Sequence, residues 1–144
     1  MRDRVTLSGL LLGVGFAGFV DETVFHQLLH WHHFYDRSTP AAGLVSDGLF
    51  HAFRWFATVA SLFLLMDARR RGPVSKTRWW GGLLVGAGAF QLYDGTVHHK
   101  LLDLHEIRYG VDIAPYDLVW NGAAVVMLLA GAVLLFRTRE RARV

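Results

Sequence analysis

The sequence predicts an all-α fold: a four-transmembrane-helix bundle made of two tandem helical hairpins with pseudo-twofold symmetry along the membrane normal. High apolar content, the placement of basic residues and an internal repeat predict it. The chain has 144 residues, of which 53% are hydrophobic and 19% charged. Its mean hydropathy of +0.30 is high for a soluble domain of this size, and its length fits one membrane domain over residues 1–144.

Four apolar stretches are each near the ~20 residues that a helix needs to cross a bilayer. They run roughly over Val5–His26, Gly48–Met66, Trp79–His99 and Asp117–Phe136. Polar segments separate the stretches, so we expect consecutive helices to cross the membrane in opposite directions.

Basic residues gather at one end of these four stretches. The residues at that end are Arg2, Arg4, Arg69, Arg70, Arg71, Lys76, Arg78, Arg137, Arg139, Arg141 and Arg143, while only Arg37, Lys100 and Arg108 lie in or beside the other connections. The positive-inside rule then places both termini in the cytoplasm and the histidine-rich loops on the external or periplasmic side of the bacterial cytoplasmic (inner) membrane. The pI near 9.7 therefore reflects topology; the lipid bilayer is an expected partner and nucleic acid is not.

The chain repeats itself. Residues 9–32 and 82–105 align without gaps at an offset of 73, and twelve of the 24 aligned positions are identical. Repeat 1 spans about residues 5–68 and repeat 2 about residues 78–138. Both copies enter from the same side, which predicts two hairpins related by an axis along the membrane normal.

The chain also resembles a known family. The strings GFVDETVFHQLLHWHHF, DGLFHAFRW and YDGTVHHKLLDLHEIRYG are similar to domain of unknown function 2243, a family of predicted bacterial integral membrane proteins, over nearly the whole chain. The resemblance supplies no activity; it implies respiratory-oxidase assembly proteins as partners, and through them copper or haem. Many members have histidines where Lys100 and Glu106 stand here, so neither position is taken as a ligand.

Acidic residues and histidines fall in one layer of the predicted helices. With a rise of 1.5 Å per residue, the first acid of each repeat lies roughly 20 Å from the cytoplasmic end of its helix, and the histidines lie slightly further out. Because the chain has eight histidines and no cysteine, a metal here must be held by nitrogen and oxygen, which suits copper, zinc or iron. The predicted ligands of this mono- or dinuclear site are His26, His51, His99, Asp21 and Asp94.

A second group of polar residues is expected around these ligands. Its members are Asp47, Arg54, Asp117, Asn121, His32 and His105. Asp21 and His32 share a helical phase, but a continuous helix would hold them about 16 Å apart. They are therefore not expected to hold the same ion.

Two other functions remain open at this point. One is a membrane haem protein, in which His26 and His99 are the axial ligands of haem b. The other is a structural or proton-relay protein without a metal, in which Arg54 pairs with Asp21 or Asp94. Metal handling or redox chemistry is the main expectation; an enzyme would be a metal-dependent oxidoreductase or hydrolase. A homo-oligomer also remains open.

Overall fold

The computed structural model describes residues 2–140, which form helices and no strands. The basic residues Arg141 and Arg143 lie outside this range. The helices are α1 (Arg2–Val20), continued by the π-helix η1 (Asp21–Leu28), then α2 (Pro40–Arg70), α3 (Lys76–Tyr93), continued by the π-helix η2 (Asp94–Leu101), and α4 (Ala114–Glu140). The α2 helix begins earlier than its predicted apolar stretch because Thr39 caps it, accepting a hydrogen bond from Ala42 N at 3.3 Å, and Pro40 occupies its first turn.

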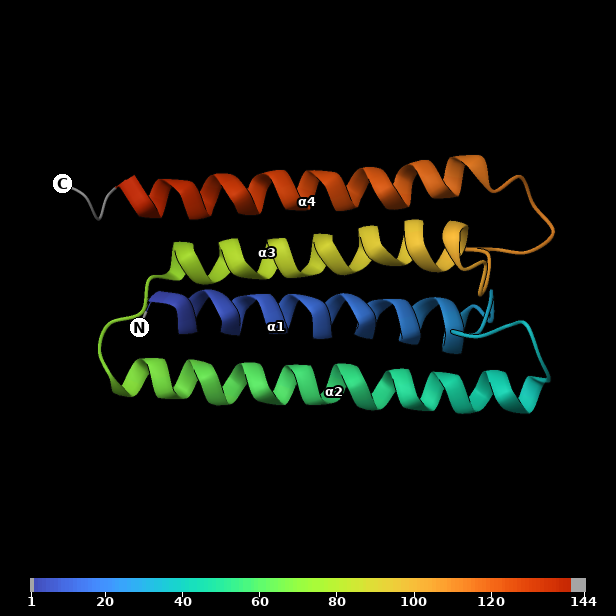
Figure 1. Ribbon diagram of the computed structural model, residues 1–144, viewed down its shortest axis with the longest axis horizontal. Helices are drawn as coiled ribbons and strands as arrows, with labels where there is room; N and C mark the ends of the chain where they lie inside the picture. Colours follow the sequence, from blue (N-terminus) through green and yellow to red (C-terminus); the bar gives the residue numbers. More distant parts are fainter. Residues whose placement is uncertain (1, 141–144) are drawn as a thin grey trace.

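The four long helices lie side by side in the order α2, α1, α3, α4 (Figure 1). Within the described residues, α1 contacts α2 and α3, α3 contacts α4, and the two outer helices do not contact each other. The helices therefore form a row with α1 and α3 at its centre. In a compact four-helix bundle, by contrast, the outer helices α2 and α4 would also contact each other.

Three of the helical segments are long and apolar enough to cross a membrane. They are Asp3–Leu28, Pro40–Arg70 and Ala114–Thr138. The predicted third span, Trp79–His99, is not among them, since its glycines, Gln91 and Asp94 lower its apolar character. Four clearly apolar spans are therefore not found among the described residues, and α3 packs in the middle of the row.

Close approach of α1 and α3 explains two of the glycines in this central pair. A Cβ atom at Gly13 would overlap the carbonyl oxygen of Leu83, and a Cβ atom at Gly86 would overlap the carbonyl oxygen of Leu10. The two contacts are reciprocal, because each joins residues 73 positions from those of the other. Small residues let the two backbones touch directly, as in many membrane helix pairs.

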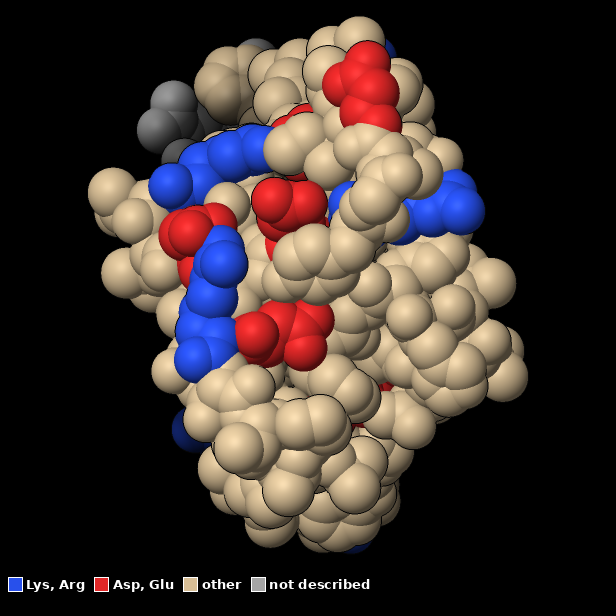
Figure 2. All heavy atoms as spheres, turned by 90° about the vertical axis from the view of Figure 1, so that its right-hand side faces the viewer, with Lys and Arg blue, Asp and Glu red and all other residues tan. Residues whose placement is uncertain are grey.

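Both central helices end in a π-helical segment at the same end of the row. The closing hydrogen bonds are of the i→i+5 kind, from Leu29 N to Val24 O at 2.9 Å and from Leu102 N to Val97 O at 2.8 Å. The loops that follow each η segment meet over this end, where Arg37 forms an ion pair with Asp103. Figure 2 shows this end carrying acidic and basic side chains together.

Candidate metal centre

Two groups of three buried side chains lie beneath these loops. One comprises Asp21, His26 and His32, and the other Asp94, His99 and His105; in each group, one atom from every residue lies within 4.8 Å of the others. Corresponding members are 73 residues apart. We name the groups triad 1 and triad 2. Each offers two imidazole nitrogens and one carboxylate oxygen.

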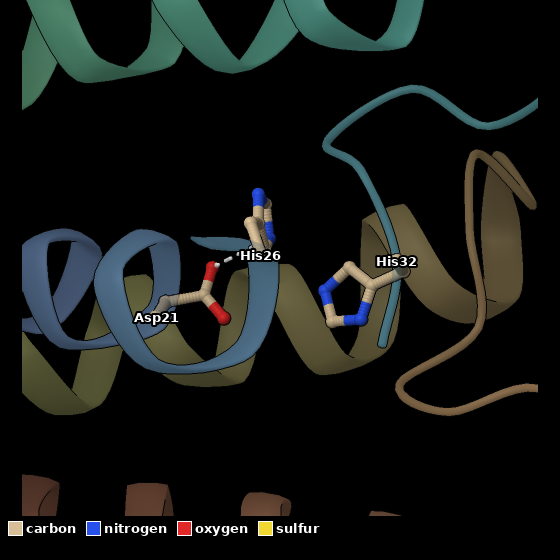
Figure 3. Close-up of side chains that lie close together, drawn as sticks. All are labelled: Asp21, His26 and His32. Carbon is tan, nitrogen blue, oxygen red and sulfur yellow. Dashed lines mark ion pairs between the residues drawn. The ribbon is translucent and has the colours of Figure 1, made fainter. Parts of the chain in front are cut away.

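The π-helical turns bring the acid and the first histidine of each triad together. In an α-helix, residues five apart point about 140° away from each other, whereas i→i+5 hydrogen bonding puts them on nearly the same face. The distance from His26 Nε2 to Asp21 Oδ2 is 3.6 Å, and that from His99 Nε2 to Asp94 Oδ2 is 3.1 Å. Figure 3 shows the first of these pairs, with His32 beside it.

The second histidine of each triad comes from the loop, not from the helix. The chain turns back after the π-helix at His30, with φ of 51°, and at the equivalent Asp103, with φ of 50°. These turns return His32 and His105 to the end of the helical row. The expectation that Asp21 and His32 stand about 16 Å apart was therefore wrong, because it assumed one continuous helix.

The loop after η1 and the loop after η2 each accept a hydrogen bond from the triad histidine of the other loop. The Nδ1 atom of His32 donates to Ile107 O at 3.0 Å, and the Nδ1 atom of His105 donates to Phe34 O at 2.9 Å. A carbonyl oxygen can only accept, so Nδ1 carries a proton in both rings, and in the neutral ring the lone pair is on Nε2. Burial, with a smaller effect of the neighbouring His105 ring, lowers the pKa of His32 to about 2. Burial likewise lowers the pKa of His105 to about 4.

The four triad imidazoles form one continuous series of ring contacts. The centroid distance is 4.4 Å from His26 to His32, 4.5 Å from His32 to His105 and 4.7 Å from His105 to His99. The middle two rings are stacked, with an interplanar angle of 5°. The two triads therefore meet where α1 and α3 end.

A buried carboxylate orients the first histidine of triad 1. His26 Nδ1 lies 3.2 Å from Asp47 Oδ1, and Asp47 also accepts from His33 Nδ1 at 2.6 Å and from Phe34 N at 2.7 Å. Glu22 lies on the same side, with Oε2 at 3.1 Å from His26 Nδ1. Asp47, predicted as a supporting residue, thus holds a histidine and the following loop in place.

The second hairpin supports its histidine more loosely. Asp117 Oδ1 lies 3.9 Å from His99 Nδ1, and this carboxylate forms an ion pair with Lys100. Asn121 donates to Asp117 O at 3.0 Å. His98, not predicted as part of the site, donates from Nδ1 to Asp94 Oδ1 at 2.8 Å.

His51 lies outside both triads. Its side chain is exposed, and its Nδ1 atom is hydrogen-bonded by Arg54. The buried Arg54 guanidinium also lies over the Phe19 ring, 5.1 Å from its centroid. Among the described residues, no ion pair joins Arg54 to Asp21 or Asp94, so the structure does not bring together the Arg54 network expected for a metal-free protein.

The chemistry of the donor atoms fits a transition metal. The Nε2 atoms of all four triad histidines are buried and make no hydrogen bond, and neither does Asp94 Oδ2; Nε2 of His26 and of His99 lies only within ion-pair distance of the acid of its triad. Each such atom costs about 1–3 kcal/mol when left unsatisfied. Two ligands of one tetrahedral zinc ion lie about 3.3 Å apart, given Zn–N bonds of about 2.0–2.1 Å. The His–Asp separations in the two triads bracket this value.

The local charge also favours a bound cation. Four carboxylates in this region are at most 2% exposed: Asp21, Glu22, Asp47 and Asp94. Ionised groups buried in a membrane protein need an opposite charge or a metal. A third group, made of Glu22, His26 and Asp47, also has ligand atoms within 4.8 Å of one another.

The sequence analysis did not include Glu22 or His98 among the site residues, and it placed His32 and His105 only in the second group of polar residues, around the predicted ligands. One signal was present in both repeats: an acid followed five residues later by a histidine, in DETVFH and DGTVHH. This spacing is wrong for one face of an α-helix and right for a π-helix. No comparable sequence pattern predicts that the loops turn back at His30 and Asp103 and bring His32 and His105 to the triads.

One of three comparisons with known proteins found a match. A family described as "Predicted membrane protein (DUF2243)" matches residues 8–138. The comparison with curated proteins and the comparison with solved structures found no match. Since the match covers nearly the whole chain, this protein belongs to the DUF2243 family of predicted membrane proteins.

Proposed function

We propose that this chain is an integral membrane metal-binding protein whose centre, formed by the two triads, acts in metal handling or redox chemistry. The observation that carries the proposal is the set of four buried Nε2 atoms without hydrogen-bond partners. In two of these histidines, Nδ1 is fixed by a backbone carbonyl, an arrangement that leaves Nε2 free for a metal.

The two equivalent triads favour two ions, one for each hairpin. Each triad supplies three protein ligands. Structural zinc sites have four protein ligands, whereas sites that react with a further molecule have three and an open position. The ligand set therefore supports exchange or reaction at the metal over a purely structural role. Zinc, copper and iron all suit imidazole and carboxylate ligands.

A haem centre has less support from the geometry. Two axial imidazoles must face each other across a flat macrocycle. Here the rings of His32 and His105 stand between His26 and His99 in the series of ring contacts. His26 and His99 are therefore not placed as facing axial ligands. The metal-free alternative, a structural or proton-relay protein, expects Arg54 to pair with Asp21 or Asp94, and no such ion pair occurs among the described residues.

We further propose that α3 and η2 form a fourth membrane span and that the two hairpins are related by a pseudo-twofold axis along the membrane normal. The reciprocal glycine contacts, the paired π-helices and the paired triads, each repeated at an offset of 73 residues, support this symmetry. The basic residues at the opposite end from the triads support cytoplasmic termini. The metal centre then lies in the outer half of the membrane domain.

Metal analysis of the purified full chain tests the proposal. The protein is purified in detergent, incubated in turn with Zn(II), Cu(I) or Fe(II), desalted and analysed for bound metal. We expect one or two ions per chain, loss of metal in a His32→Ala/His105→Ala variant, and retention in His51→Ala. All variants must remain monodisperse and helical. Metal content that is zero, or equal in wild type and the double variant, contradicts the proposal.

A further inference from the structure

An apolar cavity lies beside triad 2 and is lined mainly by residues of α2, α3 and η2, with Val14 of α1. Its volume is about 640 Å³, within the range of about 300–1,000 Å³ usual for small-molecule sites. The residues that define its chemistry are Phe34, Phe50, Phe53, Phe90, Tyr93 and His98. Its rim includes Leu49, whose side chain is 70% exposed on the outside of the helical row. A molecule dissolved in the bilayer can therefore reach it.

Aromatic rings in the cavity wall are nearly parallel. Phe34 and Phe50 are stacked at 4.9 Å with an interplanar angle of 20°, and Phe50 and Phe90 at 5.7 Å with an angle of 12°. Aromatic rings favour offset-stacked partners. These three rings stack on one another, and with Phe53 and Tyr93 they make the lining of the cavity largely aromatic, which suits a ligand that carries a flat ring.

His98 supplies an imidazole to this cavity, whose lining also includes the hydroxyl-bearing residues Ser46 and Tyr93. The Nδ1 atom of His98 donates to Asp94 Oδ1 at 2.8 Å, which leaves the Nε2 lone pair as an acceptor. The ring is held by Phe34 at 5.1 Å and by Tyr93 at 4.8 Å, both nearly perpendicular to it. A ligand hydroxyl group is the complementary donor.

The first hairpin lacks this arrangement. Phe25 occupies the position equivalent to His98, and it packs against Trp31 at 5.1 Å and Trp120 at 5.5 Å. The acceptor nitrogen and the aromatic walls therefore occur together on the triad 2 side.

We infer that this cavity binds a lipid-soluble phenol or hydroquinone, with its ring against Phe50 and Phe90 and its hydroxyl group donating to His98 Nε2. No triad residue lines the cavity, and the only link to triad 2 that the argument uses is the hydrogen bond from His98 to Asp94, so binding is tested on the metal-free protein. The inference stands whether or not the triads bind metal.

The test measures binding of decylubiquinol to the full chain in detergent, from the ligand-dependent shift of the thermal unfolding midpoint, with the protein stripped of metal by a chelator. We expect saturable binding. A His98→Phe variant, which copies the first hairpin, should bind about tenfold more weakly because one hydrogen bond is lost. His98→Gln, which keeps an acceptor, should bind within about threefold of wild type.

A second pair of variants tests the location without altering the imidazole. Leu49→Trp narrows the exposed rim and should weaken binding about tenfold, whereas Leu129→Trp on α4, at a side chain that is 63% exposed, should leave binding unchanged. Absence of decylubiquinol binding overturns the inference. So does palmitate binding as tightly as decylubiquinol with no effect of His98→Phe, which would identify a groove for acyl chains.

Discussion

Replacing Asp47 by asparagine tests whether triad 1 depends on the carboxylate behind it. Asp47 accepts three hydrogen bonds, from His26 Nδ1, His33 Nδ1 and Phe34 N, at 2.6–3.2 Å, and it is 2% exposed. An amide has one acceptor oxygen, so its NH₂ group would face a donor. Loss of a carboxylate behind a metal-bound histidine typically lowers metal affinity about 10- to 100-fold, or about 1.4–2.8 kcal/mol.

Asp117→Asn provides the matched control in the second hairpin. This carboxylate lies 3.9 Å from His99 Nδ1 and already pairs with Lys100, so we expect less than a threefold loss. Zinc affinity is measured by competition with a chromophoric chelator, and thermal unfolding of the metal-free variants shows any change in folding. An unchanged affinity in Asp47→Asn, or equal losses in the two variants, would refute the reasoning.

Three further predictions concern packing, acidification and metal removal. Gly13→Ala should destabilise the protein by about 1–3 kcal/mol, because its Cβ would overlap backbone atoms of α3, whereas Gly48→Ala, with no atom within 4 Å, should be neutral or stabilising by up to about 1 kcal/mol; chemical unfolding measures both, and equal effects would contradict the packing argument. The lowered pKa values of His32 and His105 mean that these two imidazoles bind fewer protons in the folded, metal-free protein than in the unfolded chain below pH 6.5. Their contribution to the stability of the folded protein should therefore be lost as the pH is lowered. For His105 alone, the loss between pH 6.5 and pH 4 is about 3 kcal/mol. An unfolding midpoint that does not change with pH would count against buried neutral rings. Finally, chelation should lower the unfolding midpoint and added zinc restore it, because an ion at 100 times its dissociation constant stabilises by about 2.7 kcal/mol, and no response to zinc would argue against a site in the folded state.

The sequence was sufficient to predict the helices and the layer in which the acid and the first histidine of each triad lie. Asp21, His26, Asp94 and His99 were expected in one polar layer, and the structure brings each acid next to its histidine. Helical rise and the internal repeat contain this information, because depth along a helix depends only on residue number.

Helix phase and loop paths were less predictable. The 3.6-residue periodicity used to assign faces does not hold within η1 and η2. His32 reaches Asp21 only because the chain reverses at His30, and its position depends on a hydrogen bond to Ile107, 75 residues away. Such long-range contacts leave no local pattern. The exposed position of His51 likewise follows from the row of helices, which was expected to be a bundle.

The row of helices has an electrostatic consequence for the proposed centre. A layer about one helix diameter thick, roughly 10 Å, would leave hydrocarbon on both of its broad sides. Neither side would supply water or mobile counterions, so the charge of the cluster must be balanced within it. Departure of a divalent cation would then require uptake of protons by the carboxylates and imidazoles. Metal exchange at such a centre would be close to electroneutral and coupled to proton movement.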